Sequence, residues 1–210
     1  MHDAIWFKDL HAGAYSWLGW TYWMAWVFEW SKDPRSLDRA LTLAQQALAL
    51  DDSSPKGLAL VGKIYLWKKQ HDRAIAKLKK NIELNPNYAD GIAGLGEALQ
   101  FAGKPEEAVT LFKKAIRLNP IPPVWYFHGL GSAYFLTGHY DQAITALQRV
   151  LNRNPNFWPA HIYLAASYSE LKEEEKARAE VAEVLRIVPD ISLANSKKNY
   201  PTKIQPYLSA

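Results

Sequence analysis

The sequence predicts an all-α protein, an α-solenoid of about five similar helix pairs that form a superhelix. Three series of residues in phase with one another predict this fold class. Each advances in steps of 34 or 35 residues: prolines at Pro86, Pro120, Pro155 and Pro189, alanines at Ala40, Ala74, Ala108, Ala143 and Ala177, and small residues at Gly62, Gly96, Gly131 and Ala165. Because all three series take their one longer step near residues 121–123, a repeated structural unit explains them better than coincidence.

Each repeat is expected to contain two helices, since apolar residues recur at the three- and four-residue spacing of a helix. After the first repeat, the expected helices cover residues 57–70, 72–84, 92–102, 105–118, 125–137, 140–151, 159–171 and 174–188. Glycines such as Gly103 and Gly138 are placed to end the first helix of a pair. The Asn-Pro pairs at 85–86, 119–120 and 154–155 end the second helix, because the residue before proline is pushed out of helical geometry.

Glycines also fall in the middle of the expected first helices, at Gly62, Gly96 and Gly131. A glycine there costs about 1 kcal/mol relative to alanine. We therefore expect the paired helix to approach closely at these positions.

The first repeat differs from the others because it is rich in tryptophan. Six of the nine tryptophans lie within the first 30 residues, and the 19 residues between Asp9 and Glu29 carry no formal charge. Polar and small residues such as His11 and Gly13 dilute this run, and its aromatics lie in the middle where membrane helices place them at the interfaces. We therefore expect no membrane span.

Instead, the tryptophans spread around more than half of this helix, which then needs cover on more than one side. Trp17, Trp26 and Trp30 are the candidate residues of an edge that contacts another chain. The cover is either the chain itself, by way of residues 5–7 and the nine-residue insertion in the first repeat, or a second copy, a partner protein or a domain upstream.

The repeats resemble the tetratricopeptide repeat (TPR). Its pattern is present as Phe127, Leu130, Gly131, Tyr134, Ala143 and Pro155, and again as Leu58, Val61, Gly62, Tyr65, Ala74 and Pro86. The resemblance covers five repeats, 12–54, 55–88, 89–123, 124–157 and 158–191, so that residues 1–191 form the array and 192–210 a C-terminal capping segment or tail. The pattern departs at Leu99, Ala165 and Asp52.

A narrower resemblance concerns the strings at 30–34 (Trp-Ser-Lys-Asp-Pro), 70–74 (Gln-His-Asp-Arg-Ala) and 200–201 (Tyr-Pro). They are similar to the TPR array that follows bacterial class III adenylate or guanylate cyclase domains, and similar arrays follow bacterial winged-helix regulators. This resemblance implies a regulatory array whose catalytic domain lies elsewhere.

Within these residues nothing predicts catalysis. There is no cysteine, which removes thiol nucleophiles and cysteine-held metals. No glycine-rich phosphate loop is evident, and no two of the six histidines are spaced to ligate a metal from one helix. A net charge of +4 is too small to indicate nucleic acid. We expect no enzyme, no catalytic residue, no cofactor, no metal and no nucleic-acid partner.

The TPR resemblance implies a concave groove lined by the first helix of each pair. The positions carried over to this groove are Trp20, Trp23, Lys63, Trp67, Glu97, Gln100, Phe101, Trp125, His128, Ser132 and Phe135. Aromatic rows are also common in the packing between helices. Each of these rings could therefore either contact a ligand in the groove or pack between helices.

The function expected from the sequence is a scaffold that binds a protein or peptide partner in this aromatic groove. The alternatives are a homodimer formed through the tryptophan-rich first helix and a regulatory array of a nucleotide cyclase or transcriptional regulator. A start of Met1-His2-Asp3 lacks the basic region of a signal peptide. We expect a cytoplasmic location, with the periplasm left open.

Overall fold

The computed structural model describes residues 2–27 and 30–189, with side chains from residue 11 onward. Within these ranges the chain forms ten helices and no strand. The chain divides into two compact units, Met1–Ala102 and Gly103–Ala210. The expected C-terminal segment 192–210, the pair at 200–201 and the side chains of residues 5–7 lie outside the described residues.

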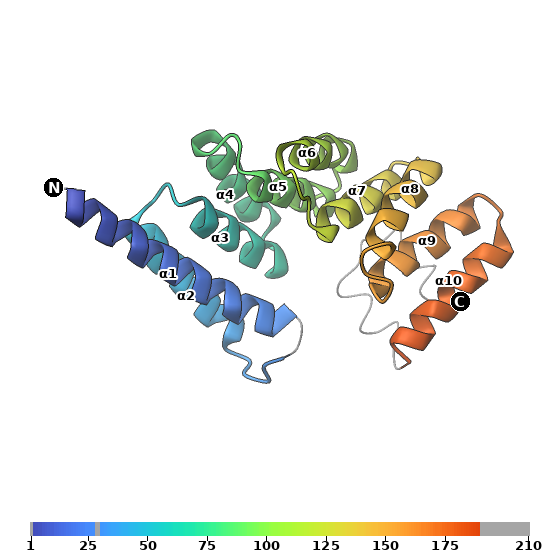
Figure 1. Cartoon of the computed structure of the whole chain (residues 1–210), viewed down its shortest axis with the longest axis horizontal. Helices are drawn as coiled ribbons and strands as arrows, with labels where there is room; N and C mark the ends of the chain where they lie inside the picture. The colour runs from blue at the N-terminus through green and yellow to red at the C-terminus, as the bar shows by residue number, and fades with distance from the viewer. Residues whose placement is uncertain (1, 28–29, 190–210) are drawn as a thin grey trace. The chain divides into compact units, whose positions relative to one another are not determined.

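The first unit contains α1 (His2–Val27), α2 (Ser36–Leu50), α3 (Pro55–Trp67), α4 (His71–Leu84) and α5 (Ala89–Phe101). Neighbouring helices pack as pairs, α1 along α2 and α3 along α4 (Figure 1). In addition α3 contacts both α1 and α5, so the three odd-numbered helices lie side by side. Side chains of these three helices therefore share one surface.

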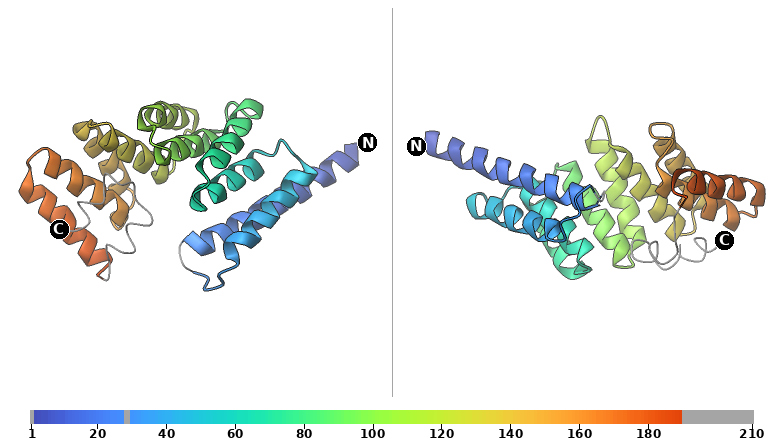
Figure 2. Two further views of the ribbon diagram at one scale, coloured as in Figure 1. Left: turned by 180° about the vertical axis from the view of Figure 1, so that it is seen from behind. Right: turned by 90° about the horizontal axis from the view of Figure 1, so that it is seen from below.

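The second unit contains α6 (Pro105–Leu118), α7 (Val124–Leu136), α8 (Tyr140–Leu151), α9 (Trp158–Glu170) and α10 (Glu174–Ile187). Here α7 pairs with α8 and α9 pairs with α10 (Figure 2). The odd-numbered helices α7 and α9 again contact each other, as they do in the first unit.

The helix bounds follow the expected ones closely, with two clear differences. The helix expected at 57–70 ends at Trp67 because Lys69 adopts a left-handed backbone, with φ of 58°. The helix expected at 92–102 begins three residues earlier, at Ala89, although its first turn contains Gly91, which has low helix propensity.

Four turns between consecutive helices each have one residue in left-handed geometry. These residues are Lys69, Gly103, Gly138 and Lys172, with φ of 58°, 80°, 80° and 66°. The two expected glycine turns are confirmed. Two lysines hold the same geometry at the equivalent positions, although a side chain disfavours it. The repeat packing therefore imposes this turn even where the residue opposes it.

The expected close approach at mid-helix glycines is confirmed in both units. A Cβ added to Gly62 would lie 2.5 Å from Cγ of Leu78 on α4. A Cβ on Gly131 would lie 2.6 Å from Cγ of Leu147 on α8. Each glycine thus makes room for a leucine of the paired helix, and that packing offsets its cost in helix propensity.

Replacing Asn81 by alanine should lower the free energy of unfolding by about 1–2 kcal/mol. Asn81 is fully buried on α4, and its Nδ2 donates to the carbonyl of Pro55 at the start of α3 over 3.0 Å. Without the amide, this bond between α4 and α3 is lost, and so is the bond that Oδ1 of Asn81 accepts from Nδ2 of Asn85 over 3.3 Å. Chemical denaturation tests this, with the exposed Asn87→Ala as the matched control; an equal effect of both variants would contradict the assigned bond.

Candidate functional site

The surface shared by α1, α3 and α5 contains a group of four tryptophans, Trp20, Trp23, Trp26 and Trp67, which we call the Trp cluster. The rings of Trp20 and Trp23 meet edge to face with centroids 5.0 Å apart, and those of Trp26 and Trp67 do so at 5.5 Å. All four side chains are partly exposed. Such edge-to-face pairs hold each ring in a defined orientation while part of it faces solvent.

An ion pair lies beside the Trp cluster. Nζ of Lys63 on α3 forms a short hydrogen bond and ion pair with Glu97 on α5, and it also lies 5.6 Å from the ring centroid of Trp23. Lys63 is buried and Glu97 is partly exposed. Because the two charges neutralise each other, the surface is aromatic with little net charge. Nε1 of Trp23 is buried and has no hydrogen-bond partner among the described residues.

The remaining expected residues of the first unit lie in different environments. Gln100 is buried and Phe101 is exposed on α5. Of the expected edge residues, Trp17 and Trp30 are exposed. Trp26 instead lies against Trp67 and belongs to the Trp cluster.

In the second unit, Trp125 and His128 of α7 are partly exposed. The His128 ring lies edge to face on Phe157 at 5.2 Å and on Tyr163 at 5.6 Å. Burial raises the pKa of Tyr163 well above its ordinary value, so this hydroxyl stays neutral. The second unit therefore has its own aromatic surface on α7.

Two expected groove residues of α7 are buried. The Ser132 hydroxyl donates to the carbonyl of Gly129 over 3.0 Å. The Phe135 ring has no exposed surface and packs 5.8 Å from both Tyr140 and Tyr163. Both side chains act in packing, and we leave them out of the binding surface proposed below.

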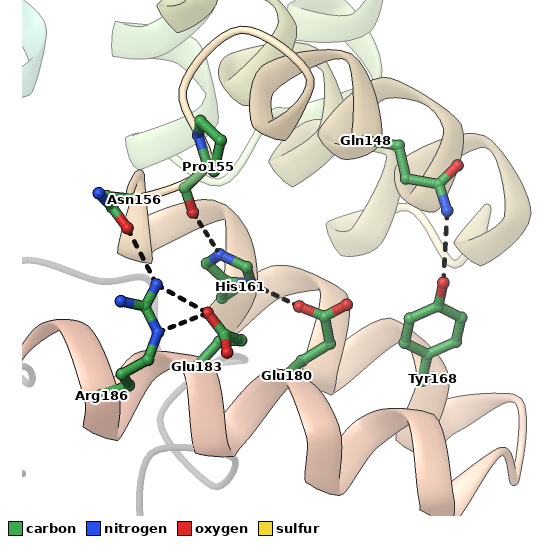
Figure 3. Close-up of polar contacts among 8 residues, drawn as sticks. All are labelled: Gln148, Pro155, Asn156, His161, Tyr168, Glu180, Glu183 and Arg186. Carbon is green, nitrogen blue, oxygen red and sulfur yellow. Dashed lines mark hydrogen bonds and ion pairs between the residues drawn. The ribbon is translucent and has the colours of Figure 1, made fainter.

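A polar network that the sequence did not predict joins α9 to α10 (Figure 3). The buried ring of His161 lies between two oxygens, with Nδ1 2.5 Å from Oε2 of Glu180 and Nε2 3.0 Å from the carbonyl of Pro155. A carbonyl can only accept, so Nε2 carries a hydrogen. Nδ1 then shares a proton with Glu180, and both ring nitrogens are satisfied.

Six residues beyond Glu180 on α10, Arg186 donates to Glu183 and to Asn156 in the loop before α9, both over 2.9 Å (Figure 3). The hydrogen bond from Arg186 holds the pKa of Glu183 below its ordinary value, and the charge of His161 adds to this effect. His161 and Glu180 are 19 residues apart on different helices, so neither spacing nor periodicity links them. This network links α10 to α9 and to the loop before it. Its polar groups are bonded to one another, so we assign it a structural role.

The described residues contain no group of three or more side chains arranged to hold a metal ion. None of the helices in that part of the chain combines the length and apolarity needed to cross a bilayer.

Comparison with protein families identifies the repeats. Residues 89–122 and residues 134–198 each match a model of the tetratricopeptide repeat. Comparison with curated proteins gave no match. The helices within these two matched segments thus belong to tetratricopeptide repeats, and the fold is a TPR-type α-solenoid, as the sequence predicts.

Solved TPR structures share the same fold. TTC0263, a thermophilic TPR protein of Thermus thermophilus, is 22% identical, with 89% of this chain and 96% of that chain covered and a TM-score of 0.69. YrrB, described as a TPR protein with an unusual peptide-binding site, is 24% identical (79% and 85% covered, TM-score 0.60). PilW, a type IV pilus biogenesis factor, is 20% identical (94% and 86% covered, TM-score 0.73). Nothing in these matches links the chain to nucleotide cyclases.

Proposed function

We propose that the chain is a non-catalytic scaffold that binds an extended segment of a partner protein on the surface shared by α1, α3 and α5, with the Trp cluster as its main anchor site. The carrying observation is that Trp20, Trp23, Trp26 and Trp67 are held ring against ring yet remain partly exposed. Tryptophan is among the residues that contribute most to binding energy at protein interfaces.

The charges beside the cluster indicate the kind of segment that would bind. Lys63 and Glu97 already neutralise each other, so a strongly charged ligand gains little here. A segment with apolar or aromatic side chains would bury the exposed parts of the tryptophan rings. The surface is formed before binding, which lowers the entropy lost on association.

The neighbours support this proposal at the level of the fold. YrrB shares the TPR fold and is described as having a peptide-binding site. Regulation of a cyclase or of a transcription factor has no such support, and neither the family matches nor the surfaces above favour it. The cytoplasmic location likewise stays an expectation.

The test begins with peptides selected on the full chain from a phage-displayed library of random sequences. Binding of one selected synthetic peptide is then measured by calorimetry. We expect Trp67→Ala to weaken binding at least tenfold, since a buried tryptophan anchor contributes about 2 kcal/mol or more. Circular dichroism checks that this variant remains helical.

The matched control is Leu84→Ala, which removes an exposed apolar side chain from α4, outside the odd-numbered helices. It should leave the affinity unchanged. Equal binding by wild type and Trp67→Ala would show that the Trp cluster is not the binding site. A specific peptide is one whose free synthetic form displaces the phage that displays it. Failure to select any such peptide would argue against the scaffold function.

A further inference from the structure

The side of α1 that is not packed against α2 and α3 carries a continuous row of exposed residues. They are Ala14, Trp17, Leu18, Thr21 and Met24, and we call them the α1 row. Trp17 and Leu18 are neighbours, and the other steps along the helix are three residues each. Trp17 is 61% exposed, Leu18 48% and Met24 38%. Positions 14, 17, 21 and 24 are separated by three, four and three residues. This alternation of three and four is the spacing of the residues by which one helix packs along another.

The α1 row is apolar in a way that exposed helix faces rarely are. None of its five residues is charged. Its one hydroxyl, on Thr21, donates to the carbonyl of Trp17 over 3.1 Å, which leaves the methyl group for packing. At its margin the Lys56 ammonium lies 4.1 Å from the ring centroid of Trp17. Monomeric proteins seldom expose such a contiguous apolar surface.

Helix α10 provides a comparison within the same chain. On α10 the exposed positions include Glu174, Glu175, Lys176, Arg178 and Arg186. The exposed side of α10 is therefore rich in charge, whereas the α1 row has none.

We infer that the α1 row docks on the α1 row of a second copy of this chain, with the two helices antiparallel across a two-fold axis level with position 19. Two observations favour a second copy. The five side chains of the row carry no charge of their own, although the chain carries +4 and the Lys56 ammonium lies at the margin of the row. It is also complementary in size to itself: in this register Trp17 faces the partner's Thr21, and Met24 faces the partner's Ala14.

The area available sets the strength of this dimer. A tryptophan buries on the order of 150–250 Å², so the whole row offers several hundred Å² per copy. A stable complex buries about 800 Å² per partner. The dimer is therefore weak, with a dissociation constant in the micromolar range, and its mass depends on concentration. This inference uses a different face of α1 from the Trp cluster and does not rest on peptide binding.

Light scattering or sedimentation of the full chain over a hundredfold range of concentration tests the dimer. We expect a mass that rises from 23.9 kDa toward twice that value. Thr21→Glu places a carboxylate in the row and should weaken the dimer at least tenfold. The matched control is Thr42→Glu on α2, because Thr42 is also exposed and donates to the carbonyl four residues earlier over 3.1 Å. A constant mass, or an equal effect of both variants, would overturn the inference.

Because the chain has no cysteine, introduced thiols report the register directly. Ala14→Cys with Met24→Cys in one chain should form a disulfide-linked dimer on oxidation. Either variant alone should not, since its two thiols lie ten residues or about 15 Å apart along the helix pair, beyond the reach of a disulfide. Efficient linkage through one position alone would show parallel pairing and overturn this register. A monomer that instead co-sediments with phosphatidylglycerol vesicles would assign the row to a lipid surface and also overturn the inference.

Discussion

Replacing Glu180 by alanine should lower the free energy of unfolding by about 2–3 kcal/mol, among the largest effects available in the second unit. Glu180 is the partner of Nδ1 on the buried His161 ring, whose other nitrogen is bound to the Pro155 carbonyl. Removing the carboxylate leaves Nδ1 inside the protein without a partner. An unpaired buried polar group costs more than the hydrogen bond itself contributed.

Two further variants separate this effect from a general loss of charge on α10. Glu180→Gln keeps an amide that bonds to Nδ1, so it should cost clearly less than alanine. Glu175→Ala removes an exposed glutamate of the same helix and should change stability little. Urea denaturation followed by circular dichroism measures all three. Equal losses for Glu180→Ala and Glu175→Ala would rule out the role assigned to the His161 pair.

Gly129→Ala should also destabilise the second unit strongly. A Cβ at this position would lie 2.2 Å from Cζ and 2.4 Å from Cε1 of Phe112, a ring that is almost fully buried. Moving that ring out of its packed position costs about 1–3 kcal/mol. The clash places Gly129→Ala at the upper end of this range, so the loss exceeds the roughly 1 kcal/mol that alanine gains in helix propensity.

The same substitution at Gly13 should have the opposite sign. Gly13 lies inside α1, and a Cβ there would have nothing within 4 Å. Gly13→Ala should therefore stabilise the protein by up to about 1 kcal/mol. Thermal unfolding compares the two variants, and Phe112→Leu combined with Gly129→Ala should recover part of the loss. If Gly129→Ala and Gly13→Ala shifted the melting temperature equally, steric conflict with Phe112 would be excluded.

The sequence predicted the helix pairs well because the fold repeats. Any position that must be small or must end a helix recurs every 34 or 35 residues, so weak local signals reinforce one another. Gly62 and Gly131 show this, since their leucine partners occupy equivalent places on α4 and α8. The left-handed turns at Lys69 and Lys172 were less visible because their residue type does not indicate the geometry.

The candidate site was harder to predict, for a physical reason specific to α1. Periodicity tells which face of a helix is buried only when the opposite face is polar. The tryptophans of α1 spread around more than half of the helix, so the sequence could not distinguish the side of Trp26, which meets Trp67, from the side of Trp17, which is exposed. The burial of Phe135 was hidden in the same way on α7, where aromatic residues follow one another on every face.

α1 contributes both to the Trp cluster, through three of that cluster's four tryptophans, and to the α1 row. A pair of chains joined through the α1 row would present two Trp clusters on one particle. A partner that displays its binding segment more than once would then bind with avidity, since the second contact forms at high effective concentration. The two binding events are also coupled thermodynamically. If a ligand of the Trp cluster strengthens dimerisation by some factor, dimerisation strengthens the binding of that ligand by the same factor.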